Sequence, residues 1–144
     1  MSAIEHSPGL YIRDIHAPLA LADYKLIAFD MDSTLINIEC VDEIAAAAGR
    51  RDEVAEITEM AMRGELADYK ESLRRRVALL AGVPVSALQK VWDDKLRFNP
   101  GVQTFVAACQ RAGLKTLLIS GGFTFFSERV RHALKLDFAR ANTL

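Results

Sequence analysis

The stretch KLIAFDMDSTL, residues 25–35, decides how this chain folds. Residues 25–29 form a short, largely apolar run that stops at Asp30, and a second carboxylate follows at Asp32. An uninterrupted run of this kind is typical of a strand buried on both faces, as in a parallel sheet. Ligands bind beyond the carboxyl ends of such strands, so we expect both carboxylates to face a crevice.

The rest of the chain alternates helical segments with two further strand candidates. The run 116–119 ends at Ser120-Gly121-Gly122, and residues 137–142 begin a third strand. A parallel pair needs one crossover helix, which residues 102–112 supply, so residues 39–98 are surplus and predict a separate helical cap. Helices are expected over residues 39–48, 51–63, 67–81 and 123–134, and over about 12 residues from Pro84, a proline tolerated in the first turn.

These segments predict an α/β fold: a partial, doubly wound (Rossmann-like) parallel sheet with a helical cap inserted after the first strand. Residues 25–38 and 99–144 are expected to form an incomplete α/β core, and residues 39–98 the cap. Residues 1–24 show no clear period and are expected to be an irregular lead-in.

Composition narrows the class of protein. The chain has 144 residues, of which 51% are hydrophobic, and 18 Lys and Arg stand against 19 Asp and Glu. This balance argues against a polybasic nucleic-acid binder and against a disordered chain. No apolar run is long enough to span a membrane, and the first residues lack a signal-peptide pattern. One bridge between Cys40 and Cys109 is possible, but free thiols are favoured. We therefore expect a cytoplasmic protein without a nucleic-acid or membrane partner.

The Asp30/Asp32 pair suits acid–base and nucleophilic chemistry. One carboxylate can act as a nucleophile and the other as a proton shuttle, and the pair attracts a hard cation such as Mg²⁺. A calcium loop is excluded because Thr34 and Leu35 occupy its fifth and sixth places. Capping of a turn by Asp32 or Ser33 leaves Asp30 unexplained, and a solvated loop remains an alternative.

The segment 120–123, Ser-Gly-Gly-Phe, is the second chemical signal. Two glycines let a ligand approach the main chain, and the following helix offers free N–H groups to an anion. An ordinary helix cap is the alternative for this segment taken alone. Carboxylates at one strand end and an oxyanion cradle at the next fit phosphoryl transfer.

Two charged residues of the cap complete the candidate site. Arg76 falls within the apolar stripe that begins at Tyr69, whereas Arg74 and Arg75 lie off it. A guanidinium there is either part of a buried ion pair or a recognition group for a carboxylate or phosphate, and both readings stay open. Glu39 either stabilises a helix N-terminus or recognises a cationic group of a substrate.

Taken together, residues 30–34 and 120–123 resemble the first two motifs of the haloacid dehalogenase superfamily of phosphatases. The segments 29–35, 39–44, 72–77 and 120–123 are similar to the branch of that superfamily that hydrolyses O-phosphoserine. The resemblance covers the chain from about residue 25 onward and is specific because four separate segments carry it.

The resemblance implies a role for each candidate residue. Asp30 is expected to attack phosphorus, and Asp32 to protonate the leaving oxygen and then activate water. Mg²⁺ is expected on the Asp30 carboxylate and the Asp32 main-chain carbonyl. The remaining expected contacts are Ser120 and Gly121 with the phosphoryl oxygens, Glu39 with the amine of O-phosphoserine, Arg76 with its carboxylate, and Tyr69 as the aromatic that closes the cap.

Beyond these segments, the superfamily pattern continues with a motif lysine that neutralises the phosphoryl group and with a Gly-Asp-Gly-x-Asn-Asp segment. Neither motif has a counterpart in this sequence. We therefore expect this chain to be a fragment that binds Mg²⁺ weakly and hydrolyses poorly or not at all alone. Unpaired strand edges would also favour self-association. Another phosphatase of the superfamily, or a product that only binds ligand, are the alternatives.

Overall fold

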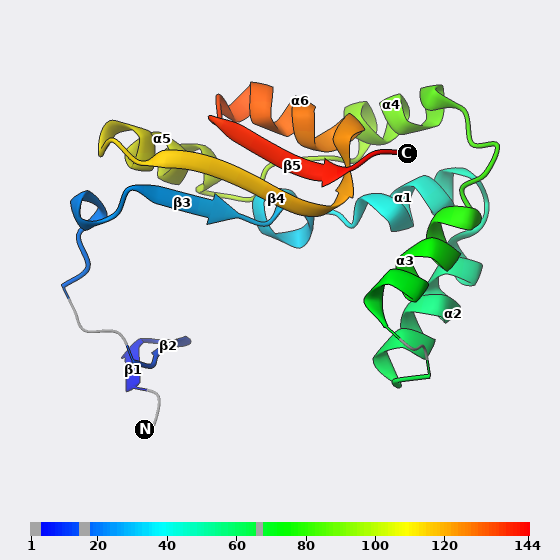
Figure 1. Ribbon diagram of the computed structural model, residues 1–144, viewed down its shortest axis with the longest axis horizontal. Helices are drawn as coiled ribbons and strands as arrows, with labels where there is room; N and C mark the ends of the chain where they lie inside the picture. Colours follow the sequence, from blue (N-terminus) through cyan, green and yellow to red (C-terminus); the bar gives the residue numbers. More distant parts are fainter. Residues whose placement is uncertain (1–3, 15–17, 66–67) are drawn as a thin grey trace.

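A parallel three-stranded sheet forms the centre of the molecule (Figure 1). The computed structural model describes residues 4–14, 18–65 and 68–144, apart from the side chain of residue 62. The strands β3 (Leu26–Phe29), β4 (Lys115–Phe123) and β5 (Phe138–Asn142) lie in the order β3-β4-β5. Both pairings are parallel, with Leu26 opposite Lys115 and Leu117 opposite Phe138. The predicted α/β class is therefore confirmed.

The described part of the chain contains six α-helices that follow the predicted pattern closely, and residue 67 of the helix predicted over 67–81 lies outside it. Pro84 lies at the N-cap, outside the first helical turn where the sequence placed it. Figure 1 shows α1, α2 and α3 beyond the carboxyl end of the sheet. The helices are α1 (Cys40–Ala47), α2 (Arg51–Met62), α3 (Tyr69–Ala78), α4 (Val85–Asp94), α5 (Val102–Arg111) and α6 (Thr124–Leu134).

The chain leaves the sheet for the helical insertion and returns from it through two segments that run side by side. Ile36 and Phe98 form an isolated antiparallel bridge. Next to it, the Asn37 N–H donates to the Arg97 carbonyl at 3.0 Å, and the Arg97 N–H donates to Asn37 Oδ1 at 2.7 Å. These bonds lie beside the limits of residues 39–98, which we propose as the cap.

One apolar interior serves both the sheet and the inserted helices. A single buried cluster contains Ile44 of α1, Val54 of α2 and Leu88 of α4 together with Leu118 of β4 and Phe126 of α6. Because these elements share a core, the position of the inserted helices relative to the sheet is fixed by packing. Within the described ranges, no helix has the length and apolar character needed to cross a bilayer.

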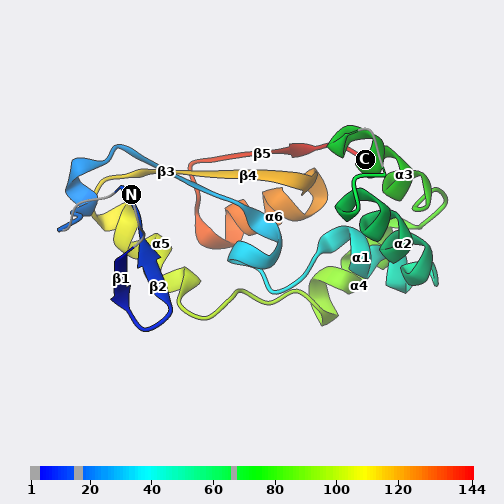
Figure 2. The same ribbon diagram turned by 90° about the horizontal axis from the view of Figure 1, so that it is seen from below.

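The sheet is covered by helices on one face only, which corrects the prediction that the first strand is buried on both faces. Figure 2 shows α5 and α6 on the same side of the three strands. On that side Phe29 packs edge-on against Phe105 of α5, with ring centroids 6.1 Å apart. On the opposite side Leu26, Ile119 and Phe138 are about half exposed. An apolar sequence run alone does not tell how many faces of a strand a helix covers.

Strand β4 is longer than predicted. The sequence placed its end at Ser120, but the strand runs through both glycines to Phe123. Its register against β5 becomes irregular between Ile119 and Phe123, where Asn142 pairs with Phe123. Glycines within a strand often mark such a bulge, so the pair that suggested a strand end instead marks a bend inside the strand.

Of the lead-in expected to be irregular, residues 1–3 and 15–17 lie outside the described ranges, and the described residues include regular elements. The lead-in contains an antiparallel hairpin of β1 (Ile4–Ser7) and β2 (Leu10–Ile12) and a single turn, η1 (Leu21–Asp23). Gly9 turns the hairpin with φ of 81°, a value that favours glycine, and its N–H donates to Glu5 Oε1. These strands are too short to show a period in the sequence.

The start of β5 is tied to β4 by one carboxylate. Asp137 accepts hydrogen bonds from the Thr116 N–H at 2.9 Å, the Thr116 hydroxyl at 3.0 Å and Lys115 Nζ at 2.8 Å. These donors, Lys115 first, lower the pKa of Asp137 to about 2. The carboxylate therefore stabilises the folded state in its ionised form.

We expect Asp137→Ala to lower the free energy of unfolding by about 1–2 kcal/mol at pH 7, because three donors lose their acceptor. The folded-state pKa lies below the ordinary value of 3.8, so the contribution is complete above pH 4 and is lost as pH falls toward 2. Urea unfolding of both proteins at several pH values measures the difference. Asp14→Asn, in the exposed lead-in, is the control, and an equal effect of the two substitutions would contradict the assignment.

Candidate active site

A kinked turn after β3 brings the two aspartates to the carboxyl end of the sheet. The turn, η2 (Met31–Leu35), buries Met31 and Leu35 and contains Ser33 with φ of 53°. A non-glycine residue in this left-handed region is uncommon and makes the chain reverse sharply. With the apolar residues anchored in the core, Asp30 and Asp32 are directed out of the same turn.

Asn99 holds this turn from the far side of the insertion. Its Nδ2 donates to the carbonyl of Thr34 at 2.8 Å and to that of Ile36 at 3.1 Å, and its N–H donates to the Leu35 carbonyl at 3.0 Å. The sequence Asn99-Pro100-Gly101 by itself is typical only of a turn. An Asn before Pro can bond neighbouring backbone, but its partners, more than 60 residues away in sequence, are visible only in the fold.

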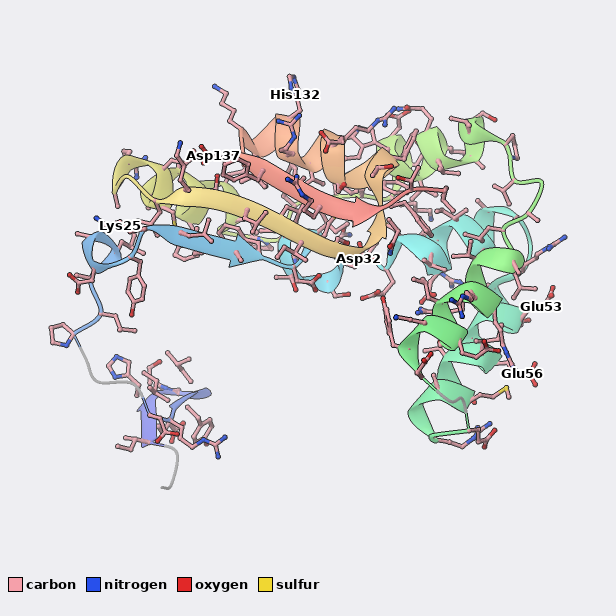
Figure 3. All side chains as sticks on the ribbon, viewed as in Figure 1. Lys25, Asp32, Glu53, Glu56, His132 and Asp137 are labelled. Carbon is pink, nitrogen blue, oxygen red and sulfur yellow. The ribbon has the colours of Figure 1, made fainter. Side chains whose placement is uncertain are left out.

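Asp32 lies at the N-terminus of α1. Its Oδ2 accepts a hydrogen bond from the Cys40 N–H at 3.3 Å, whereas its Oδ1 is buried without a partner among the described residues. Figure 3 shows Asp32 where the sheet meets the helical insertion. Burial raises its pKa to about 6, the bond from Cys40 partly opposes the rise, and the nearby charges of Glu39 and Asp30 add to it. Asp32 can therefore hold or release a proton near neutral pH.

Asp30 and Glu39 are exposed carboxylates that accept hydrogen bonds from different hydroxyl groups. Asp30 Oδ2 accepts from the Thr34 hydroxyl at 3.2 Å, and its position at the end of β3 leaves the carboxylate accessible. Glu39 is the N-cap residue of α1, but its side chain makes no capping bond. Its Oε1 accepts instead from the Ser33 hydroxyl at 2.6 Å. Ser33, which the sequence did not single out as a site residue, thus holds Glu39 beside Asp32.

The bulged part of β4 forms the opposite wall. Ser120 is buried, and its Oγ accepts from the Gly122 N–H at 2.9 Å. Because that oxygen acts as acceptor, the hydroxyl proton is available to another acceptor. A Cβ at Gly122 would lie 3.1 Å from Ser120 Oγ and 3.2 Å from Met31 Cε, so the close packing of β4 against η2 favours glycine there.

Helix α3 contributes Tyr69 and Arg76, two turns apart. Arg76 Nε is buried and lacks a hydrogen-bond partner, and no carboxylate of the described chain lies within ion-pair distance of it. Its neighbour Arg75 is exposed and pairs with Glu71 at 2.7 Å. Of the two readings left open for Arg76, the buried ion pair therefore finds no support in the described residues, and a group that recognises an anion fits better.

All seven residues proposed from the sequence line one cavity of about 230 Å³. Carboxylates from η2 and from the start of α1 face the hydroxyl and glycines of β4, and the guanidinium of α3 borders the same space. The lining residues are Asp30, Asp32, Glu39, Val41, Tyr69, Leu73, Arg76, Ser120, Gly121 and Gly122.

A larger hollow of about 500 Å³ lies elsewhere, between α1 and α4. Its lining combines small apolar residues with charged side chains of both signs: Glu43, Ala46, Ala47, Arg51, Ala87, Lys90, Val91, Asp94 and Lys95. It lacks the paired carboxylates and close-packed glycines of the smaller cavity, so we assign no chemistry to it. His132, labelled in Figure 3, also lies far from Asp32.

The donor set offers part of a metal site. Among the residues that the structure describes, no three His, Cys, Asp or Glu side chains are arranged to hold a metal ion. Asp30 and Asp32 nevertheless line the same cavity, and Asp32 Oδ1 is a buried oxygen with no hydrogen-bond donor. Carboxylate oxygens of this kind suit a hard cation such as Mg²⁺. The two cysteines, Cys40 and Cys109, are free and buried, as expected.

The fold and this cavity define a class of protein. The profile of the haloacid dehalogenase-like hydrolases matches residues 24–143, and the chain belongs to that family. The match begins just before β3 and includes every residue that lines the cavity.

Within the family, the chain is similar to curated proteins named phosphoserine phosphatase. It is 62% identical over 144 residues to one from a Polaromonas species, covering 100% of this chain and 61% of the relative. It is 61% identical over 138 residues to one from Albidiferax ferrireducens, covering 96% of this chain and 58% of the relative. The chain thus spans about three fifths of the length of these relatives.

Solved structures lead to the same group. A phosphoserine phosphatase with an analogue of its phospho-aspartyl intermediate matches at a TM-score of 0.76 and 39% identity, covering 84% of this chain and 57% of that one. A substrate-bound phosphoserine phosphatase matches at a TM-score of 0.76 and 38% identity, with the same coverage.

The raised pKa of Asp32 predicts that this residue, although suited to proton transfer, lowers the stability of the fold when it is ionised. Because the folded state holds this proton more tightly than the unfolded chain, ionisation of Asp32 destabilises the fold as pH rises from about 4 to 6. We expect the neutral substitution Asp32→Asn to stabilise the metal-free protein at pH 7 by roughly 1–3 kcal/mol. The gain should disappear below pH 4.

Thermal unfolding in the presence of a chelator measures this gain. Asp30→Asn is the matched control, since Asp30 is exposed and its replacement should change stability by less than about 0.5 kcal/mol. A lower melting temperature for Asp32→Asn at pH 7 would refute the assigned environment.

Proposed function

We propose that this chain carries the nucleophile and the substrate-recognition groups of a phosphomonoester hydrolase that converts O-phosphoserine into serine and phosphate. One observation carries the proposal. A single cavity is lined by two aspartates, Asp30 and Asp32, by the hydroxyl and glycines of β4, and by two residues of opposite charge, Glu39 and Arg76. The similarity to proteins named phosphoserine phosphatase supports the same substrate, although the chain spans only about three fifths of their length.

In the proposed reaction, the exposed Asp30 carboxylate attacks phosphorus. The bond between phosphorus and the serine oxygen breaks, leaving an aspartyl-phosphate, and Asp32 donates its proton to the departing oxygen. Asp32, now ionised, then removes a proton from water as the water attacks phosphorus. The bond between phosphorus and Asp30 breaks, which releases phosphate and restores the Asp30 carboxylate. A pKa of about 6 suits both steps, because Asp32 exchanges its proton readily near neutral pH.

Substrate orientation follows from the charges around the cavity. We propose that Glu39, held by Ser33, binds the amine, and that Arg76 binds the carboxylate. The Ser120 hydroxyl and the Gly121 main chain bind phosphoryl oxygens, and the Tyr69 ring closes the cap side. Arg76 suits a carboxylate because its guanidinium is planar and its Nε has no competing partner.

We propose Mg²⁺ as the cofactor, held by the Asp30 carboxylate and the Asp32 main-chain carbonyl. When bound, the ion would neutralise charge on the phosphoryl group and reduce repulsion between that group and Asp30. One carboxylate and one main-chain carbonyl form an incomplete ligand set, so the described residues predict weak binding of Mg²⁺. We also propose a cytoplasmic location, which suits the free thiols, and keep self-association through the strand edges as a prediction.

Three phosphate esters test the recognition groups. O-phosphoethanolamine lacks the carboxylate of O-phosphoserine, and 3-phosphooxypropionate lacks its amine. We expect the wild-type chain to prefer O-phosphoserine to both by about ten-fold in calorimetric titrations, the size of one charge-assisted contact. Arg76→Gln should remove the preference over O-phosphoethanolamine, and Glu39→Gln the preference over 3-phosphooxypropionate.

Arg75→Gln is the matched control, because this exposed neighbour of Arg76 lies outside the cavity. Equal affinity of the wild-type chain for all three esters would exclude an amino-acid phosphate and favour another small-molecule phosphatase of the family.

Release of phosphate from O-phosphoserine with Mg²⁺ present tests turnover. Any release should vanish in Asp30→Asn, because the nucleophile is lost. Near-normal turnover by the 144-residue chain would contradict the expected low activity. Binding of O-phosphoserine with no release would support a protein that only binds ligand.

A further inference from the structure

Gly121 is a glycine for a reason other than backbone conformation. Its φ lies outside the left-handed region that favours glycine. A Cβ at this position would overlap the hydroxyl of Tyr69, and the Tyr69 Cζ would lie 3.5 Å from it. The absence of a side chain therefore leaves room for a phenol that approaches the strand from the cap.

Tyr69 lines the cavity from the side of α3. It is the first residue of α3, a helix whose N-terminus is capped by a bond from the Glu71 N–H to Asp68 Oδ1 at 2.8 Å. The residue is 61% exposed, although its hydroxyl reaches Gly121 in the wall of the cavity. A side chain that is open to solvent on one side and touches β4 with its tip can move without disturbing the core.

The Tyr69 hydroxyl lies beside Gly121, where a phosphate bound in the cavity would need hydrogen-bond donors. A phosphate ester presents three oxygens, whereas the Gly122 N–H of β4 already donates to Ser120 Oγ, which leaves the Ser120 hydroxyl as a donor on that side. The hydroxyl of a tyrosine is a hydrogen-bond donor, so it can donate to a phosphoryl oxygen. A phenylalanine ring at this position would close the mouth equally well but would offer no donor.

We propose that the Tyr69 hydroxyl binds substrate directly: it lies on Gly121 and donates a hydrogen bond to a phosphoryl oxygen held beside that glycine. This inference rests on the proposed function, since it needs a phosphate ester in the cavity. It makes Tyr69 a specificity-determining residue for the phosphate group, in addition to a cover for the site.

Tyr69→Phe isolates the hydroxyl, because the ring is retained. Titrations of the full 144-residue chain with O-phosphoserine and with inorganic phosphate should show affinity reduced by about ten-fold for both ligands, the usual effect of losing a donor to a charged group. Tyr24→Phe is the control, because this half-exposed tyrosine lies outside the cavity and its loss should leave both affinities unchanged.

A second measurement tests the contact without any ligand. The chain has three tyrosines, and fluorine labelling gives each a ¹⁹F resonance, with Tyr69→Phe identifying that of Tyr69. Gly121→Ala should displace the ring and shift this resonance. Gly122→Ala should not, because a Cβ there meets Ser120 and Met31 instead.

The outcomes distinguish failure of the role inferred for the Tyr69 hydroxyl from failure of the proposed function. If the wild-type chain binds phosphate and Tyr69→Phe binds it equally well, the hydroxyl has no role in binding and this inference fails while the proposed function stands. If the wild-type chain binds neither ligand, both fail. An unchanged Tyr69 resonance in Gly121→Ala would also overturn the inference, because the contact on which it rests would be absent.

Discussion

The candidate site depends on the bond between the Asp32 carboxylate and the first N–H of α1. This bond fixes a carboxylate at the positive end of a helix while the surrounding side chains remove it from water. Burial is the stronger of the two effects, so the pKa rises despite the favourable hydrogen bond. The same contact joins the end of β3 to the start of the inserted helices, which makes the chemistry of Asp32 sensitive to how those helices pack.

Two side chains, Asn99 from the far end of the insertion and Ser33 within the turn, keep this arrangement in place. The Asn99 side chain donates to the carbonyls of Thr34 and Ile36 at the end of the turn after β3. The Ser33 hydroxyl, inside that turn, donates to the Glu39 carboxylate. The left-handed conformation of Ser33 is costly for an isolated residue, so neighbouring bonds must compensate for it. Such over-determined backbone holds carboxylates in position before a ligand arrives, which lowers the entropy that binding must overcome.

Charge is distributed unevenly around the cavity. The acidic groups of the cavity come from Asp30 and Asp32 and from the start of α1, whereas the half-buried guanidinium of Arg76 comes from α3 and forms no ion pair within the described chain. Its charge opposes the rise that burial causes in the pKa of Asp42, but its buried Nε has no hydrogen-bond acceptor. A buried donor without an acceptor is unfavourable, and an anion bound between α3 and β4 would supply one.

Local sequence alone determined where the helices and the sheet strands lie along the chain, and it marked residues 30–32 and 120–123 as candidates for chemistry. Helix periodicity, glycines at helix ends and carboxylates at a strand end are all properties of neighbouring residues. The family resemblance added roles for Asp30, Arg76 and the other candidates, which the structure brings to one cavity. Only the tertiary structure decided that helices cover a single face of the sheet, that β4 continues through its glycines, and that Tyr69 meets Gly121. These features depend on contacts between segments far apart in the chain, and such contacts leave no periodic trace in the sequence.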